Sequence, residues 1–259
     1  MTRPSPFRAA AAALLCASAV MAAAILPAGA LSPTDKPEIE KIVREYLLAN
    51  PEVLRDAMME LQRREAEAES KERQAAVKKY EKLIFDSPRG VVVGNRQGDV
   101  TVVEFFDYNC GYCKRALEDM MTLMKADPKV KFVLKEFPVL GQGSVEAAQI
   151  AVAVRMQDKD GKKYMDFHQR LLATRGQVDG AKAREAAKGA GVDMAQLERD
   201  LKTDEIKATL VESHQLADAL GINGTPSYIV GSDVVPGAVG AEKLRGHIAS
   251  VRKCGQAQC

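Results

Sequence analysis

A cysteine pair at the junction of an apolar run and a helix constrains this chain most. Residues 100–113 read VTVVEFFDYNCGYC, a run of β-branched and aromatic residues that delivers Cys110 and Cys113. The next eight residues, 114–121, place apolar side chains at helical spacing. A cysteine at a helix N-terminus meets free backbone N–H groups and the positive end of the helix dipole, and both favour the thiolate. The pattern predicts a thiol–disulfide exchange site.

A cysteine pair of this spacing is also a common half of a zinc site. Zinc usually takes two such pairs, or one pair with histidines. Past residue 30 the only other cysteines are Cys254 and Cys259, five residues apart, and the histidines His168, His214 and His247 stand singly in helical contexts. We therefore favour a redox pair over zinc, and expect no metal and no cofactor.

The first 30 residues have the pattern of a secretory signal peptide. Basic residues come first, residues 9–26 are almost all apolar, and small residues precede a cleavage point after Ala30. An uncleaved membrane anchor is the alternative, because the apolar run is nearly long enough to span a membrane. Cys16 lies in this run and is expected to be removed with it. We expect a periplasmic protein, in a compartment where disulfides persist, although composition leaves full secretion open.

The predicted mature chain carries no excess of either charge. Of 37 lysines and arginines, Arg3 and Arg8 fall in the predicted signal peptide, which leaves as many basic residues as the 35 acidic ones. A neutral balance without a basic run argues against a nucleic-acid partner.

Residues 31–86 read as a helical arm and linker. Apolar residues recur at helical spacing over 37–48, and a second apolar face over 53–61 follows Asn50 as a predicted N-cap and Pro51 as a first helical position. Beyond Gln62 the chain is charged almost throughout. A helix over 51–83 spans about 50 Å, and such a charged helix is expected to bury little on its own domain.

Short apolar helical faces are marginal in water without a partner. We therefore read residues 37–62 as an oligomerisation element that holds an apolar tip away from the body of the protein. The alternative is that this element folds back on the rest of the chain.

Residues 87–259 read as one α/β domain. Apolar runs over 91–93, 130–137, 227–230 and 234–235 predict strands in addition to the run before Cys110. The signal is helical from about 144 to 220, and a last helix is expected over 241–252. This order predicts an α/β fold with a helical insertion at about 141–222.

Several of these segments resemble known families. EFFDYNCGYCKR resembles the active-site segment of the DsbA-like branch of the thioredoxin superfamily, and Gly224-Thr225-Pro226 resembles its cis-proline loop. The helical block sits where DsbA-like proteins insert a helical domain into the thioredoxin fold. Residues 31–86 resemble the N-terminal region of the copper-sensitivity suppressor ScsC family, whose members include trimers with disulfide isomerase activity. The resemblance implies a thioredoxin fold and a homo-oligomer, with a trimer favoured.

The resemblance also implies roles for the cysteine pair. Cys110 is expected to be the nucleophile, and Cys113, one turn into the helix, the more buried resolving thiol. Gly111 and Tyr112 are expected to tune the pair, and both match the DsbC type of isomerase. Because Tyr112 carries no positive charge, unlike the histidine of strongly oxidising relatives, we predict a couple less oxidising than DsbA.

Three more residues take their expected roles from the resemblance. Pro226, if cis, shapes a substrate groove, and Thr225 offers its backbone N–H and C=O to an extended client segment; an ordinary trans turn is the alternative. Glu104 stands where relatives keep a buried acid that assists proton transfer around Cys113, and Lys135 is a candidate partner for it. The alternative is a solvated strand carboxylate.

The last two cysteines, Cys254 and Cys259, enclose four residues. A structural disulfide that ties the tail, worth at most about 2 kcal/mol, is favoured over a second redox pair.

Three functional hypotheses remain. The preferred one is a periplasmic disulfide isomerase and reductase, which acts on misoxidised client proteins and is kept reduced by a membrane redox partner. The second is a DsbA-like oxidase that donates its disulfide to reduced clients. The third is a protein that handles copper through Cys110 and Cys113, since soft thiolates suit Cu(I).

Overall fold

The structure, a computed structural model, describes residues 36–257 and 259. The chain divides between Arg63 and Arg64 into two units, which are described separately. The predicted signal peptide lies outside the described residues. None of the helices in the part of the chain that is described has the length and apolar character needed to cross a membrane.

The first unit exposes its apolar side chains. Helix α1, Lys36–Ala49, contains no buried residue, and helix α2, Glu52–Lys79, begins in this unit. The exposed apolar side chains of the two helices are Ile39, Ile42, Val43, Tyr46, Leu48, Val53, Leu54, Met58, Met59 and Leu61. Within the described part of this unit, residues 36–63, these apolar side chains therefore remain in contact with solvent.

Asn50 acts at a different helix end from the one predicted. Its side-chain amide donates to the carbonyl oxygen of Tyr46 at 2.9 Å, so it closes α1, and α2 begins only at Glu52. The amide nitrogen of asparagine can serve a free carbonyl at the end of the preceding helix as readily as its oxygen can serve the next one.

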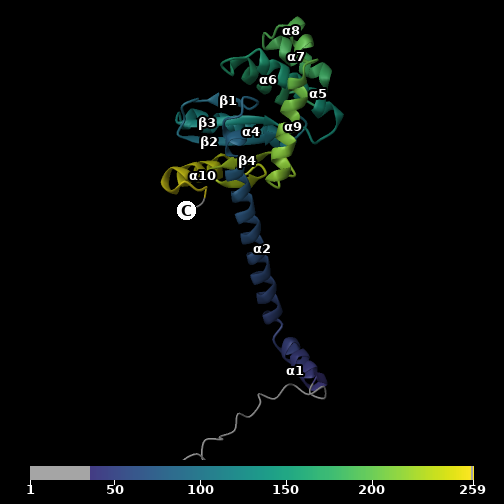
Figure 1. The fold of residues 1–259 in the computed structure, drawn as a ribbon, viewed down its shortest axis with the longest axis vertical. Helices are drawn as coiled ribbons and strands as arrows, with labels where there is room; N and C mark the ends of the chain where they lie inside the picture. The colour runs from purple at the N-terminus through teal and green to yellow at the C-terminus, as the bar shows by residue number, and fades with distance from the viewer. Residues whose placement is uncertain (1–35, 258) are drawn as a thin grey trace, which may run out of the picture. The chain divides into compact units, whose positions relative to one another are not determined.

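The second unit is built on a mixed five-stranded sheet (Figure 1). Its strands lie in the order β1-β3-β2-β4-β5, and only β2 and β3 are parallel. Their bounds are Val91–Gly94 for β1, Val100–Phe106 for β2, Val130–Glu136 for β3, Ser227–Val230 for β4 and Asp233–Pro236 for β5. The predicted strands are all present.

Helices cover both faces of this sheet. Helices α4 (Gly111–Ala126) and α10 (Ala241–Cys254) contribute to the core on one face, and α9 (Asp204–Ala219) and α3 (Glu81–Phe85) to the core on the other. The block between β3 and β4 comprises α9 together with α5 (Gln142–Met156), α6 (Lys162–Leu172), α7 (Gly180–Gly189) and α8 (Met194–Asp200), with α5 to α8 gathered together in Figure 1. The predicted α/β fold with a helical insertion is confirmed.

The end of the charged helix is part of this unit, which differs from the expectation that it buries little. Val77 on α2 and Ile84 on α3 are fully buried in the apolar cluster that also holds Phe105 and Ile229. Both residues therefore pack on the same face of the sheet, Val77 from the last turn of α2 and Ile84 from α3. The packed domain accordingly begins before residue 87.

Lys135 does not pair with Glu104, contrary to our expectation. In the parallel register Lys135 stands beside Phe105 and Glu104 beside Leu134, so the two charged residues point to opposite faces of the sheet. Lys135 is 1% exposed and its Nζ lies 3.3 Å from Oε1 of Glu212 on α9. Strand pairing decides this partner, and a single strand sequence does not contain that information.

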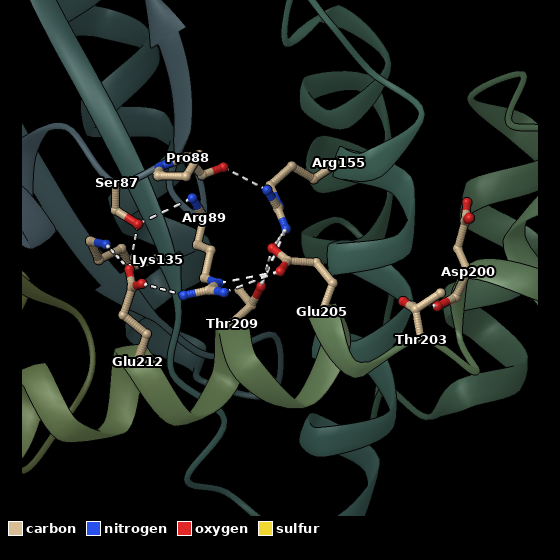
Figure 2. Close-up of polar contacts among 10 residues, drawn as sticks. All are labelled: Ser87, Pro88, Arg89, Lys135, Arg155, Asp200, Thr203, Glu205, Thr209 and Glu212. Carbon is tan, nitrogen blue, oxygen red and sulfur yellow. Dashed lines mark hydrogen bonds and ion pairs between the residues drawn. The ribbon is translucent and has the colours of Figure 1, made fainter.

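A network of charged side chains surrounds that pair (Figure 2). The Arg89 guanidinium lies 3.1 Å from one Glu212 oxygen and 3.3 Å from Glu205. Glu205 is also 2.8 Å from Arg155 on α5, whose Nη1 donates to the carbonyl oxygen of Pro88. The network joins the start of the packed domain to the helical insertion.

The C-terminal cysteines form the predicted disulfide. Cys254, the last residue of α10, is bonded to Cys259, and Ala257 between them is buried. The Ala257 N–H donates to Asp233 Oδ2 at 3.2 Å, and its carbonyl oxygen lies 2.9 Å from His247 Nδ1. These contacts dock Ala257 on the first residue of β5 and on α10.

Candidate active site

The cysteine pair lies at the junction between β2 and α4. Cys110 is the N-cap residue of α4, and Cys113 falls in its first turn. Both are free thiols, 6% and 1% exposed, with Cys113 the more buried as expected. Cys110, as the N-cap residue, therefore lies at the very end of the helix, where the unpaired backbone N–H groups are concentrated.

The two sulfurs differ sharply in acidity. A hydrogen bond from the Cys113 thiol, helped by the backbone N–H groups of Cys113 and Tyr112, lowers the pKa of Cys110 to about 5 against the opposing effect of burial. The same hydrogen bond, followed by burial, raises the pKa of Cys113 far above its ordinary range. At neutral pH the site thus holds one thiolate and one thiol, which is what a nucleophile with a second, resolving sulfur requires.

The loop before β4 meets this pair from more than a hundred residues away. The Thr225–Pro226 peptide bond is cis, and the Thr225 carbonyl oxygen lies 3.1 Å from Cys110 Sγ. Since β4 pairs with β2, the sheet itself brings this loop beside the first cysteine. The structure therefore places both predicted loop residues at the site.

The two residues between the cysteines face solvent. Gly111 is exposed, with open space where a side chain would project, and Tyr112 is 59% exposed. The Arg115 guanidinium carbon lies 4.7 Å from the centroid of the Tyr112 ring, in cation–π range. The Arg115 guanidinium thus packs on the Tyr112 ring, and neither residue between the cysteines carries a charge.

Glu104 is buried on the face of β2 that carries the apolar core under α4. Burial first, and the negative charge of Asp119 second, raise the pKa of Glu104 to about 8. A carboxyl with this pKa changes its protonation state just above neutral pH. Its burial, which strand alternation alone left open, is confirmed.

Asp107 is a site residue that the sequence analysis missed. Its buried carboxylate accepts four hydrogen bonds, from the backbone N–H of Asn109 at 2.7 Å, the Ser144 hydroxyl at 2.7 Å, and the N–H groups of Val139 and Leu140 at 2.8 and 2.9 Å. One carboxylate thereby joins the cysteine segment to the loop after β3 and to α5. The contact to the N–H two residues on is a common local pattern for aspartate, but its other partners are distant in sequence.

Two further side chains tie the cysteine helix to the insertion. The Asn109 amide donates to the Val178 carbonyl at 3.0 Å and accepts from the Val178 N–H at 2.7 Å. Lys114 Nζ donates to the Thr174 carbonyl oxygen at 2.5 Å. The insertion is therefore fixed directly to the segment that carries Cys110, and sequence alone offered no sign of these contacts.

No cluster of three or more histidine, cysteine, aspartate or glutamate side chains suited to a metal ion occurs among residues 36–257 and 259.

Comparisons with known proteins agree with this geometry. A family model described as "DSBA-like thioredoxin domain" matches residues 101–249, more than half of the chain. The chain belongs to the DsbA-like thioredoxin family. A second model, "Copper resistance protein ScsC N-terminal domain", matches residues 35–68 and thus the exposed apolar faces of α1 and early α2.

Similar solved structures include members of both types. A thioredoxin-like oxidoreductase from Silicibacter pomeroyi is 42% identical, with a TM-score of 0.63, over 67% of this chain and 98% of that one. A Proteus mirabilis ScsC variant with a linker deletion is 27% identical, with a TM-score of 0.64, over 87% of this chain and 99% of that one. Residues 101–249 therefore form a DsbA-like thioredoxin domain, similar to a thioredoxin-like oxidoreductase and to ScsC.

Curated relatives are matched over shorter parts of their length. The thiol:disulfide interchange protein DsbA of Bordetella pertussis is 28% identical over 52% of this chain and 64% of its own. The chain spans only a quarter of the first such relatives, two Salinispora proteins named as Na(+)/H(+) antiporters.

Proposed function

We propose that this protein is a periplasmic protein disulfide isomerase and reductase. Cys110 attacks a wrong disulfide in a client to give a mixed disulfide, which is resolved either by a client thiol or by Cys113. The first route shuffles the bond and the second reduces it. The cycle starts from the reduced pair, so it needs a membrane redox partner that returns electrons to Cys110 and Cys113.

The observation that supports this proposal is the exposed apolar surface of residues 36–63. Ten exposed apolar side chains on two helices leave a large area in water, which a second and third copy of the chain can cover. The match to the ScsC N-terminal domain over residues 35–68 supports the same use. Several catalytic domains on one oligomeric arm, with a trimer favoured, can engage a misfolded client at more than one point.

The acidity of Cys110 supports the same direction. Its pKa of about 5 lies between the values of about 3.5 for DsbA and about 7 for thioredoxin. A thiolate that is less stabilised than that of DsbA makes the disulfide form less oxidising. In this proposal Thr225, whose carbonyl oxygen lies 3.1 Å from Cys110 Sγ, pairs through its backbone with an extended client segment next to the reacting sulfur.

Polar substitution of the exposed face tests the link between assembly and isomerisation. We expect the mature protein to be an oligomer by light scattering, and the double variant Ile42→Lys/Leu54→Lys to be a monomer. Reactivation of scrambled ribonuclease should fall about tenfold or more in that variant, because multivalent contact with the client is lost, while oxidation of a reduced peptide is retained. Lys71→Glu, on the charged part of α2, is the matched control. A monomeric mature wild-type protein would contradict the proposal.

A DsbA-like oxidase is the second candidate, favoured by the resemblance to the Bordetella pertussis protein. It differs in the direction of electron flow, since the oxidised pair then donates its disulfide to reduced clients. Faster oxidation of a reduced peptide than reactivation of scrambled ribonuclease, at equal protein concentration, would identify this function.

Copper handling is the third candidate, favoured by the description of the family model that matches residues 35–68. Two thiolates, Cys110 and Cys113, would be the soft ligands for Cu(I). One equivalent of Cu(I) bound by the reduced wild-type protein and none by Cys110→Ser would support this role.

A further inference from the structure

Tyr228 has a buried hydroxyl that no described residue satisfies. The residue is 1% exposed, yet its hydroxyl forms no hydrogen bond within the part of the chain that is described. The other buried polar atoms in this condition are Arg155 Nε and His247 Nε2, on α5 and α10. A buried hydroxyl without a partner is unfavourable and rare in folded proteins, so one that is kept needs an explanation.

The position of Tyr228 in the sheet supplies an explanation for its buried hydroxyl. It follows cis-Pro226 by two residues and stands directly opposite Glu104 in the antiparallel β2–β4 pair. Directly opposed residues project to the same face of a sheet, and this face packs under α4, where Cys113 lies. The phenol thus shares one buried compartment with the carboxyl and with the inner thiol.

We propose that Tyr228 is a positioning residue for the resolving cysteine. The Tyr228 hydroxyl shares a bridging water with the Glu104 carboxyl, and this water holds the carboxyl in place to receive the proton of Cys113. Buried waters commonly satisfy polar groups of this kind. Because a hydroxyl both donates and accepts, it can orient the bridging water for the ionised carboxylate and for the protonated acid alike. Phenylalanine at position 228 has no hydroxyl and supports neither protonation state of Glu104.

The proton matters in the resolving step. Cys113 gives its proton through the water to Glu104, and its sulfur attacks Cys110 Sγ in the mixed disulfide. The Cys113–Cys110 bond forms, the bond from Cys110 to the client sulfur breaks, and the client leaves as a thiolate with the electron pair. The client disulfide is reduced and the cysteine pair is oxidised. This inference rests on the proposed roles of Cys110 and Cys113 but not on the oligomer.

Other ionisable groups in this compartment bear on the test. Burial raises the pKa of the Tyr228 phenol far above its ordinary range, so it remains a donor. The groups whose charge acts on it are Glu104 on β2, and Cys110, Cys113 and Asp119 on α4 and its cap. α10 brings His247, whose Nδ1 lies by the Ala257 carbonyl oxygen of the tail. In the β2–β3 register Glu104 stands beside the apolar Leu134.

Carboxyl titration by carbon-13 NMR of the reduced full chain tests the proposal directly. Because the pKa of Glu136 is also raised to about 8, Glu104→Gln is needed to assign the Glu104 signal. Tyr228→Phe removes the hydroxyl that holds the bridging water, so the Glu104 midpoint should move up by about one pH unit, a tenfold change in the ionisation equilibrium. Tyr164→Phe, which removes another fully buried phenol hydroxyl, should leave that midpoint in place.

A kinetic readout accompanies the titration. Stopped-flow release of the second thionitrobenzoate from a Cys110 mixed disulfide reports the resolving step. At pH 7 the rate in Tyr228→Phe should be about tenfold lower, as the upward midpoint shift implies, and should approach the wild-type rate at high pH. An unchanged Glu104 midpoint in Tyr228→Phe would overturn the proposal. If wild type fails to release thionitrobenzoate, the proposed function fails, and the NMR titration still decides the role of Tyr228.

Discussion

Replacing Cys113 with alanine should turn the protein into a trap for its clients. The Cys110 thiolate still attacks a client disulfide, but the neighbouring sulfur that resolves the mixed disulfide is gone. Intramolecular attack by a positioned group gains several orders of magnitude over attack by a thiol from solution, so reductase turnover should fall about a thousandfold or more. Covalent complexes with client proteins should accumulate on non-reducing gels.

The matched control is Cys110→Ala, which should form no such complexes and show no turnover. Alkylation of Cys110 in the Cys113→Ala background should also be slower at neutral pH than in wild type, because the hydrogen bond from Cys113 is the largest cause of the lowered Cys110 pKa. In wild type, alkylation should persist down to about pH 5 and decline below it. Complexes trapped equally by Cys110→Ala would contradict the assignment of the nucleophile.

Replacing Glu212 with alanine should lower the free energy of unfolding more than any other substitution proposed for this protein. Lys135 would then remain buried without its closest counter-charge, the Glu212 carboxylate. In the native protein that carboxylate lies 3.3 Å from Lys135 Nζ. Removal of one member of a buried ion pair costs about 3–5 kcal/mol, because the remaining charge has lost its water without compensation. Guanidinium unfolding curves of the mature protein measure this loss as a lower midpoint.

The pH dependence of that variant has a defined sign. Burial already lowers the pKa of Lys135, and the loss of Glu212 lowers it further. Between the folded and the unfolded pKa the unfolded chain binds more protons, so stability rises with pH. The deficit of Glu212→Ala should therefore shrink as the pH rises toward the ordinary lysine value of about 10.4.

An exposed ion pair provides the control for this experiment. Glu198 and Arg184 lie 2.8 Å apart with about half of each side chain in solvent, and Glu198→Ala should cost at most about 1 kcal/mol. The double variant Lys135→Met/Glu212→Leu should recover much of the loss, since apolar replacements of a buried pair are often neutral. Equal losses for Glu212→Ala and Glu198→Ala would contradict the buried-pair interpretation.

Local patterns were enough to predict the elements of this fold. Runs of β-branched residues marked β2 and β3, and helical spacing marked the insertion and α10. The cysteine pair and the distant Thr225-Pro226 indicated the site because a resemblance linked them, and the pairing of β4 with β2 explains why they meet. Each of these signals is carried by residues close together in the chain or by a known family pattern.

Contacts that depend on register or on loops were not predictable in the same way. Lys135 was assigned to the wrong acid because its face is decided by the pairing of β2 with β3. Asp107 collects donors from two loops and α5, and the Tyr228 hydroxyl matters only because β4 sets it opposite Glu104. These are long-range facts, and no single stretch of sequence contains them.

The reduction potential of the Cys110–Cys113 pair tests the proposed direction most directly. The chain has no tryptophan, so the oxidised fraction is measured by mass-tagged alkylation after equilibration in glutathione buffers, with Cys254→Ser/Cys259→Ser to remove the second disulfide. We expect a value between about −270 mV, as in thioredoxin, and about −120 mV, as in DsbA. A potential at or above about −120 mV would contradict an isomerase and reductase and indicate an oxidase instead.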